Sequence, residues 1–330
     1  MRSKKGGALS GVMRVVLGLF ALIALVACSS GPERLVIVNP SRHGERITRD
    51  MIDILESNLD SGGQELTVSD SGRIPDLEEL ESFIQFELDE PPDVVVAMTD
   101  EAVSIVEPYR DPRSTALVYW AHSHPDALAS QLGYEGDIPN ATGVALGMSP
   151  TSAEDLRMDY LLRLVPDAED VLVVHNPADT DAQEGLSSLK GVARERGVEV
   201  VEGLVRSRAD AVDHLELISE VDAVFLAPDR FIGMVAAEYY ESARLHRVPL
   251  AAPNTSSVVD GALVSYTFSE KSVAQLMAQM VRDVVFAEIS PEEFQPQLPE
   301  FELAFNLGVA REIGVEPSDA FLQEVDVLLE

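Results

Sequence analysis

Polar side chains recur along the sequence directly after short apolar runs, where the end of a strand is expected. The eight positions are Asn39, Ser41, Thr99, His122, Ser123, Asn176, Asp229 and Asn254. The hydroxyl and amide groups of Thr99, Ser123 and Asn176 can bind a carboxylate or a carbonyl. The carboxylate of Asp229 can accept hydrogen bonds from an ammonium group. As a set, these residues predict a polar cleft that binds a small ligand.

Each of these residues has a second interpretation as a turn or cap residue. Asn, Asp, Ser and Thr commonly accept hydrogen bonds from the backbone N–H groups that begin a helix. The sequence leaves both roles open at every position. Trp120, the only tryptophan, is open in the same way, because its ring could stack on a flat ligand or pack in the core.

The sequence offers little support for metal binding or catalysis. His122, His124 and Asp126 are close together, but their spacing matches no closed zinc site and no cysteine or further clustered histidine completes one. The patterns of a nucleophile elbow, a phosphate-binding loop and a dinucleotide-binding turn are all absent from the sequence. We therefore expect no metal, no cofactor and no enzymatic activity.

Strands and helices that alternate along the chain would position these polar residues. In the first half, the expected strands are 35–38, 65–68, 93–97 and 116–120, and the expected helices are 46–59, 76–88 and 100–109. The strands are short, apolar and bounded by turn residues, while the helices carry apolar residues at helical spacing. This alternation predicts an α/β lobe with a doubly wound parallel sheet. Ligands bind beyond the carboxyl ends of the strands in such sheets, where the polar residues are expected.

The alternation restarts in the second half and predicts a second α/β lobe. There the expected strands are 170–175, 198–204, 223–227 and 250–252, and the expected helices are 153–164, 181–196, 209–219 and 232–245. We predict an N-terminal lobe of residues 34–148 and 255–287, and a C-terminal lobe of residues 149–254 and 288–330. Polar and small residues near 147–152 and 253–257 would form the hinge between the lobes.

The N-terminus has the pattern of an export signal. Basic residues at positions 2, 4, 5 and 14 flank or precede 13 apolar residues at 15–27, fewer than the roughly 20 that cross a bilayer as a helix. Residues 25–28, Leu-Val-Ala-Cys, resemble the lipobox of bacterial lipoproteins, in which the cysteine carries the lipid. We predict a signal peptide at 1–27, lipidation at Cys28, a linker at 28–33 and a location on the periplasmic side of the cell envelope. A retained membrane anchor is the alternative.

The composition is strongly acidic. The chain has 57 acidic and 24 basic residues, for a net charge of −33, and the leader carries four of the basic residues, so the predicted mature part has −37. Such a charge repels nucleic acid and anionic lipid, so we expect membrane contact only through the lipid anchor. Cys28 is the only cysteine, so stability must come from the core rather than from internal disulfides. The scarcity of lysine suggests a saline habitat, and an ordinary acidic periplasmic protein is the alternative.

Five segments of the second half follow one another in the order and spacing of a known family. Segments 139–144, 161–166, 173–177, 227–229 and 306–315 read Pro-Asn-Ala-Thr-Gly-Val, Leu-Leu-Arg-Leu-Val-Pro, Val-Val-His-Asn-Pro, Ala-Pro-Asp and Asn-Leu-Gly-Val-Ala-Arg-Glu-Ile-Gly-Val. From Val94 onward the chain resembles ABC-transporter substrate-binding proteins with the type I periplasmic-binding fold, in the branch that includes tryptophan and tyrosine binders. The turn at 39–44 is more charged than is usual in that family.

The resemblance implies a Venus-flytrap architecture in which the chain passes three times between the lobes and the ligand lies in the cleft. It also implies ligand contacts after the third strand, at Asn176 and at Asp229, with an ABC permease and its ATPase as partners. The expected function is a solute-binding lipoprotein that delivers a small polar, amino-acid-like ligand to an ABC importer. A lipoprotein of the same fold that regulates a sensor or a cell-envelope enzyme by protein contact is the alternative.

Overall fold

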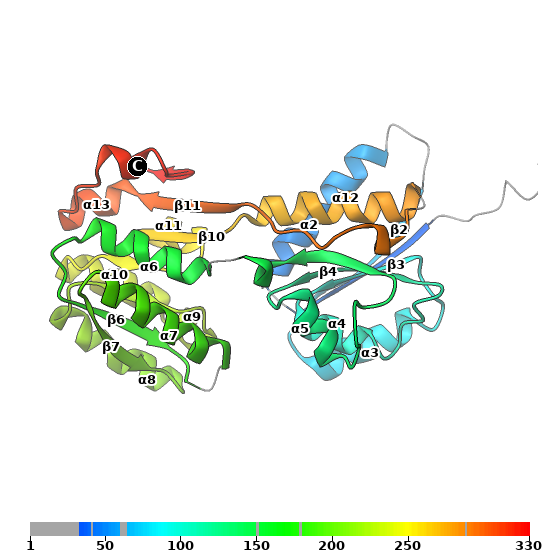
Figure 1. Cartoon of the computed structure of the whole chain (residues 1–330), viewed down its shortest axis with the longest axis horizontal. Coiled ribbons are helices and arrows are strands. Elements are labelled where there is room, and N and C mark those ends of the chain that lie inside the picture. The colour runs from blue at the N-terminus through cyan, green and yellow to red at the C-terminus, as the bar shows by residue number, and fades with distance from the viewer. Residues whose placement is uncertain (1–32, 41, 60–64, 150–151, 178–179, 288) are drawn as a thin grey trace, which may run out of the picture.

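Two α/β lobes lie side by side along the long axis of the molecule, each built around its own sheet (Figure 1). The computed structural model describes residues 33–40, 42–59, 65–149, 152–177, 180–287 and 289–330. The predicted leader, Cys28 and Ser41 lie outside the described residues. The predicted fold class, α/β with two parallel-dominated lobes, is confirmed.

The first sheet of the described residues has five parallel strands in the order β2-β1-β3-β4-β5. They are β1 (Glu33–Asn39), β2 (Leu66–Arg73), β3 (Val94–Met98), β4 (Ala116–Ala121) and β5 (Ala141–Ala145). Strands β3 and β4 are buried along their whole length because helices cover both faces of the sheet.

Two groups of helices cover the two faces of the first sheet. One core contains Met51 of α2 and Met277 of α12, and the other contains Ile84 of α3, Val103 of α4 and Leu128 of α5. The bounds of these helices are α2 (Arg42–Leu59), α3 (Leu77–Glu87), α4 (Asp100–Val106), α5 (Pro125–Gln131) and α12 (Glu270–Phe286). Successive strand residues alternate between the two cores, as side chains of a pleated strand must.

The second sheet, within the described ranges, has seven strands in the order β12-β11-β10-β9-β8-β6-β7. They are β6 (Asp170–His175), β7 (Glu199–Leu204), β8 (Val224–Leu226), β9 (Leu250–Ala251), β10 (Val264–Phe268), β11 (Phe301–Asn306) and β12 (Val327–Leu329). The β10–β11 pair is antiparallel, and the other pairs are parallel. The second lobe is therefore a mixed sheet with a dominant parallel part.

Helices also cover both faces of the second sheet. One core takes in α6 (Ala153–Leu164), α7 (Thr180–Glu195), α13 (Leu307–Ile313) and α14 (Asp319–Leu322), and the other takes in α8 (Arg208–Asp213), α9 (Arg230–Met234) and α10 (Ala236–His246). Helix α11 (Thr255–Asp260) follows β9 and contacts β10 and β11. The three 3₁₀ helices of the described residues are η1 (Leu146–Met148), η2 (His214–Glu220) and η3 (Pro291–Glu293).

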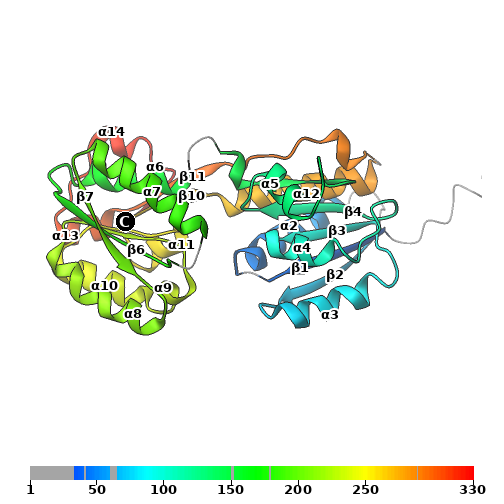
Figure 2. The same cartoon turned by 60° about the horizontal axis from the view of Figure 1, so that its bottom comes forward.

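The described chain crosses between the lobes after η1, after β10 and before β11, and Figure 2 shows α12 on the first lobe. The predicted boundaries differ from this arrangement at two places. Residues 255–268 were predicted in the first lobe, but β10 pairs with β9 and β11 in the second sheet. The polar turn at 253–257 interrupts the apolar pattern only because it leads into α11.

The second difference concerns the return to the C-terminal lobe, which was predicted at residue 288. Gln297 still belongs to the first lobe, because its N–H donates to the carbonyl of Gly143 at 2.8 Å and its carbonyl accepts from the N–H of Ala145 at 3.0 Å. The chain joins the second sheet only with β11. Every helix in the described part is too short or too polar to cross a membrane.

Candidate functional site

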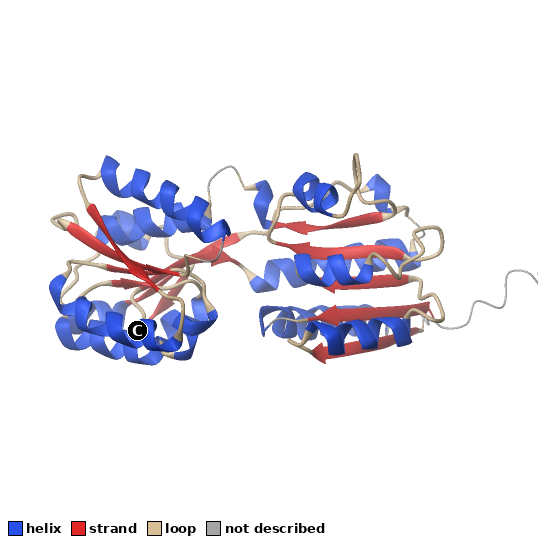
Figure 3. Cartoon of the chain, turned by 90° about the horizontal axis from the view of Figure 1, so that it is seen from below, coloured by secondary structure: helices blue, strands red, loops and turns tan. Residues whose placement is uncertain are grey.

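The carboxyl ends of the parallel strands bring the polar residues of each lobe to one edge of its sheet. In Figure 3 the arrows of the first sheet point toward the second lobe. Thr99 and His122 follow β3 and β4 at this edge. Asn176 and Asn254 follow β6 and β9, which run parallel within the second sheet, so they share an edge as well. The region between the lobes is therefore where a ligand of this fold is expected.

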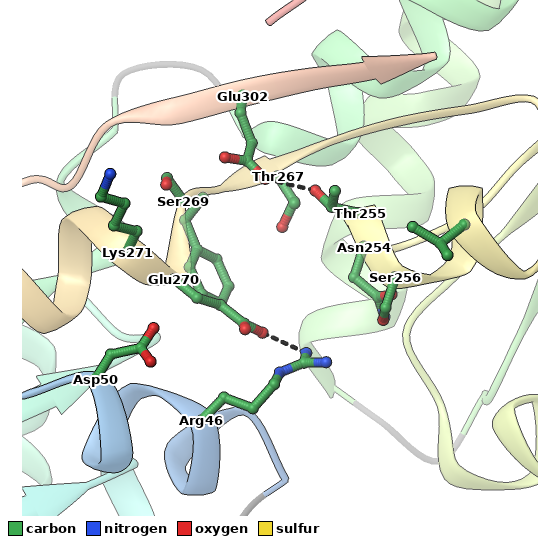
Figure 4. Close-up of a pocket in the computed structure, with 12 residues that line it drawn as sticks. Arg46, Asp50, Asn254, Thr255, Ser256, Thr267, Ser269, Glu270, Lys271 and Glu302 are labelled. Carbon is green, nitrogen blue, oxygen red and sulfur yellow. Dashed lines mark hydrogen bonds and ion pairs between the residues drawn. The ribbon is translucent and has the colours of Figure 1, made fainter. Parts of the chain in front are cut away.

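A pocket of about 360 Å³ lies at this place, with walls from both lobes (Figure 4). The first lobe supplies α2 and the start of α12, and the second lobe supplies the start of α11, the end of β10 and β11. The lining residues are Arg46, Asp50, Asn254, Thr255, Ser256, Val259, Thr267, Phe268, Ser269, Glu270, Lys271 and Glu302. This volume lies within the range of pockets that hold small molecules.

The pocket carries charges of both signs. Arg46 donates from Nη2 to Oε1 of Glu270 at 2.5 Å, and Figure 4 shows Asp50 nearby on the same helix as Arg46. Lys271 is exposed and makes no ion pair with the described residues. It is one of only four lysines in the chain. A cation that lines a cleft in so acidic a protein can attract an anionic ligand group.

Among the predicted site residues that the structure describes, Asn254 is the one that lines the pocket, and it organises the second-lobe wall. Its Oδ1 accepts from the backbone N–H of Ser257 at 2.9 Å and from the hydroxyl of Ser256 at 2.7 Å. Next to it, the hydroxyl of Thr255 donates to Oε1 of Glu302 at 2.6 Å. Asn254 therefore both caps α11 and lines the pocket, so the two interpretations of this residue are compatible.

Thr99 caps α4 at the cleft edge of the first sheet. Its Oγ1 accepts from the N–H of Ala102 at 3.2 Å, and its side chain is almost completely buried. The backbone of Thr99 has φ of 140°, a value that a β-branched residue adopts only under strain. Strain of this kind concentrates at functional sites.

Asp100 organises the turn that carries His122 and Ser123. Its carboxylate accepts from the N–H of His122 at 3.0 Å and from the N–H of Ser123 at 3.3 Å. The His122 side chain is 52% exposed, so it remains accessible beside the cleft. Burial, with smaller contributions from Asp137 and Asp100, raises the pKa of Tyr119 on the adjoining strand to about 12.

Asn176 and Asp229 meet across the ends of β6 and β8. The Asn176 Nδ2 donates to Oδ2 of Asp229 at 3.0 Å. The other oxygen of Asp229 accepts from the N–H groups of Phe231 at 2.7 Å and Ile232 at 3.2 Å, so it caps α9. The structure thus brings these two predicted residues together, although neither lines the pocket described above.

Asn39 occupies a different environment from the one expected. Its residue is 1% exposed, its N–H donates to Oγ of Ser71 at 3.0 Å, and its carbonyl accepts from the N–H of Ile74. The side chain of Asn39 is therefore part of the interior and does not line the pocket. Ser41, which follows it, lies outside the described residues.

Trp120 packs in the core of the first lobe. It is fully buried, and its ring lies 5.4 Å from the ring of Phe268 and 5.0 Å from that of His122. Phe268 in turn lines the pocket. Trp120 is therefore a core residue. Because its ring contacts Phe268, its fluorescence should respond to changes at the pocket.

None of the five charged pocket residues was predicted as a site residue from the sequence. Arg46 and Asp50 are four residues apart on α2, which places both on one face of the helix that follows β1. Glu270 and Lys271 begin α12 directly after β10. Glu270 and Lys271 follow the end of a strand, as the predicted site residues do. They could have been predicted as site residues if residues 264–268 had been recognised as a strand of the second sheet.

A family model for ABC transporter substrate-binding proteins matches residues 88–327, which is most of the chain. The chain belongs to this family. Among solved structures, members of the same fold cover 91% of the chain. No curated protein matches the sequence.

Three solved structures are similar in fold to this substrate-binding protein. The ABC domain from Streptococcus pneumoniae in complex with L-Trp is 17% identical, with a TM-score of 0.70 and all of that chain covered (100%). A conserved domain protein from Vibrio cholerae is 18% identical, with a TM-score of 0.69 and 100% of that chain covered. A ligand-free, open substrate-binding protein with adhesive properties from Clostridium difficile is 14% identical, with a TM-score of 0.70 and 99% of that chain covered. At these identities the likeness establishes the fold.

Proposed function

We propose that the protein is an extracytoplasmic solute receptor that binds a small polar, amino-acid-like ligand between its lobes. It delivers this ligand to an ABC permease driven by an ATPase, and a lipid on Cys28 holds it on the periplasmic side of a membrane. Closure around the ligand is a population shift that contacts to both lobes stabilise.

The observation that carries this proposal is the pocket between the lobes, with cations and carboxylates in one cavity. Lys271 and Arg46 suit a carboxylate group, and Asp50 and Glu302 suit an ammonium group. An amino acid carries both groups a short distance apart. The complex of the S. pneumoniae domain with L-Trp, a solved structure of the same fold with a TM-score of 0.70, supports the same class of ligand.

A thermal-shift screen of the twenty L-amino acids against the wild-type protein tests the ligand class. The best amino acid is then titrated by calorimetry into the wild type, Lys271→Met and Lys190→Met. We expect Lys271→Met to bind roughly ten- to a hundredfold more weakly, because a hydrogen bond to a charged group contributes about 1.5 to 3 kcal/mol.

Lys190→Met is the matched control for this titration, since Lys190 pairs with Glu202 away from the pocket. It should bind like the wild type. If no amino acid raises the melting temperature of the wild type, the proposed ligand class is wrong. Equal affinity in Lys271→Met and the wild type would remove Lys271 from the site.

Metabolic labelling with a fatty acid tests the anchor separately. The lipobox-like residues 25–28 lead us to expect label on the wild type and none on Cys28→Ala. Incorporation of label into the variant would show that the protein is anchored by other means.

A further inference from the structure

Arg157 is a buried cation directly behind the second-lobe wall of the pocket. It lies on α6, which begins where the chain first enters the second lobe, and its residue is 2% exposed. Its Nη1 donates to the carbonyl of Pro253 at 3.3 Å. Pro253 directly precedes the pocket residues Asn254, Thr255 and Ser256. Arg157 therefore connects α6 to the turn that lines the pocket through this hydrogen bond.

The remaining surroundings of Arg157 satisfy its charge poorly. The guanidinium lies 4.5 Å from the ring centroid of Phe225, and its Nη2 is 3.7 Å from Oε1 of Glu154. Neither Nε nor Nη2 donates a hydrogen bond to the described residues. Burial lowers the pKa of Arg157 to about 10, against a smaller opposing effect of Glu154, so the group remains charged at neutral pH.

A charge held in this way costs stability that an apolar side chain of the same length would not. A purely structural role therefore explains Arg157 poorly. The turn that begins at Pro253 offers a better explanation. The carbonyl that Arg157 holds belongs to the residue immediately before the three pocket residues of this turn.

The other contacts of this turn are made within the second sheet and α11. Asn254 accepts from Ser256 and Ser257, and Thr255 donates to Glu302 on β11. Among the hydrogen bonds of the described residues, the one from Arg157 joins the start of the turn to α6.

We propose that Arg157 is a positioning residue of the pocket: its guanidinium holds the carbonyl of Pro253, so that the turn 254–256 keeps the shape that meets the ligand, and its charge favours an anionic ligand group at that wall. This inference rests on the proposed ligand-binding function for its second part only. The positioning of the turn can be measured without any ligand.

Hydrogen exchange detected by mass spectrometry, on the protein without ligand, tests the positioning. Arg157→Met should speed exchange in a peptide that spans 254–262 by about tenfold or more, because the N–H groups of Ser257 and Ala262 are bonded within this segment. Arg157→Lys should restore slow exchange in part, since an ammonium group can still donate to Pro253. Arg157→Gln provides a second neutral variant if Arg157→Met folds poorly.

Arg163→Met is the control on the same helix. The Arg163 side chain is partly exposed, and its Nη1 donates to Glu324 at 2.9 Å. The Arg163→Met control should leave the 254–262 peptide unchanged. If all Arg157 variants exchange like the wild type in this peptide, the positioning role is overturned.

The charge preference is tested with the best amino acid of the thermal-shift screen and its C-terminal amide, which lacks the carboxylate. Arg157→Met should weaken binding of the acid at least tenfold, and binding of the amide by much less, while Arg157→Lys should recover most of the affinity for the acid. Equal weakening of acid and amide would overturn the charge part of the inference. If the wild type binds no amino acid, the proposed ligand class and the charge part fail, and the exchange experiment still decides the positioning.

Discussion

Two buried arginines, one in each lobe, differ in how completely the protein satisfies them. Arg110, in the first lobe, donates to both carboxylate oxygens of Glu107 at 2.9 and 2.8 Å and to the carbonyls of Thr115 and Pro139. Arg157, in the second lobe, donates one hydrogen bond to Pro253, and two of its nitrogens donate none to the described residues. Both residues are almost fully buried.

Their positions in the sheets explain this difference. Thr115 and Pro139 precede β4 and β5, so Arg110 lies at the amino ends of the strands, away from the cleft. Pro253 follows β9, so Arg157 lies at the carboxyl ends, beside the pocket. A saturated network suits a group that only stabilises the lobe. Incomplete satisfaction at the binding edge suits a group whose position serves a ligand.

The largest expected effect is on Arg110. Arg110→Met leaves the Glu107 carboxylate without its cation, so we expect a loss of about 3–5 kcal/mol in the free energy of unfolding. Arg157→Met replaces a poorly satisfied charge by an apolar side chain and should leave that free energy unchanged or raise it by about 1–4 kcal/mol. Urea unfolding of both variants measures the difference. Equal losses in the free energy of unfolding would contradict the proposed difference between Arg110 and Arg157.

A smaller loss of stability is expected from two helix-capping aspartates, Asp76 in the first lobe and Asp229 in the second, and only Asp229 is also expected to affect ligand binding. Asp229 and Asp76 each accept two backbone N–H groups at the start of a helix. Replacing either by Ala should cost about 0.5–2 kcal/mol of stability. Only Asp229→Ala should also weaken ligand binding, because Asp229 shares the cleft edge with Asn176 and Asn254. Calorimetric titration decides this, and unchanged affinity in Asp229→Ala would assign it to capping alone.

The smallest expected effect comes from the surface. With a net charge of −33, the carboxylates of both lobes repel one another, and salt screens this repulsion over the Debye length of about 3 Å reached in molar salt. We expect the free energy of unfolding to rise by up to about 1 kcal/mol as salt is added. A stability that stays flat or falls across the salt series would remove the argument for a saline habitat.

Much of the fold could be predicted because its strands are short, continuous apolar runs. Residues 94–98 and 116–121 form β3 and β4, buried over their full length, as their composition indicates. The second lobe was harder near its centre. Strand β9 has only two residues, and the alternating polar residues of β10 resemble a connection between lobes more than a strand.

The candidate site was predictable only where a polar residue directly follows a strand. Asn254 could be found in this way, whereas Arg46 and Asp50 lie one and two turns into α2, where an exposed helix face carries the same kinds of residue. Asn39 fits the rule and is nevertheless buried, because β2 and the following segment cover the end of β1. Burial of this kind depends on neighbours that are distant in the sequence.

Small-angle X-ray scattering tests the central claim, that a small solute binds between the lobes and draws them together, most directly. The wild type is measured alone and saturated with the best amino acid of the thermal-shift screen, and Lys271→Met is measured at the same amino acid concentration. We predict a smaller radius of gyration for the saturated wild type and a weaker decrease for Lys271→Met. A radius of gyration that stays constant in the wild type, at saturation shown by calorimetry, would contradict the claim.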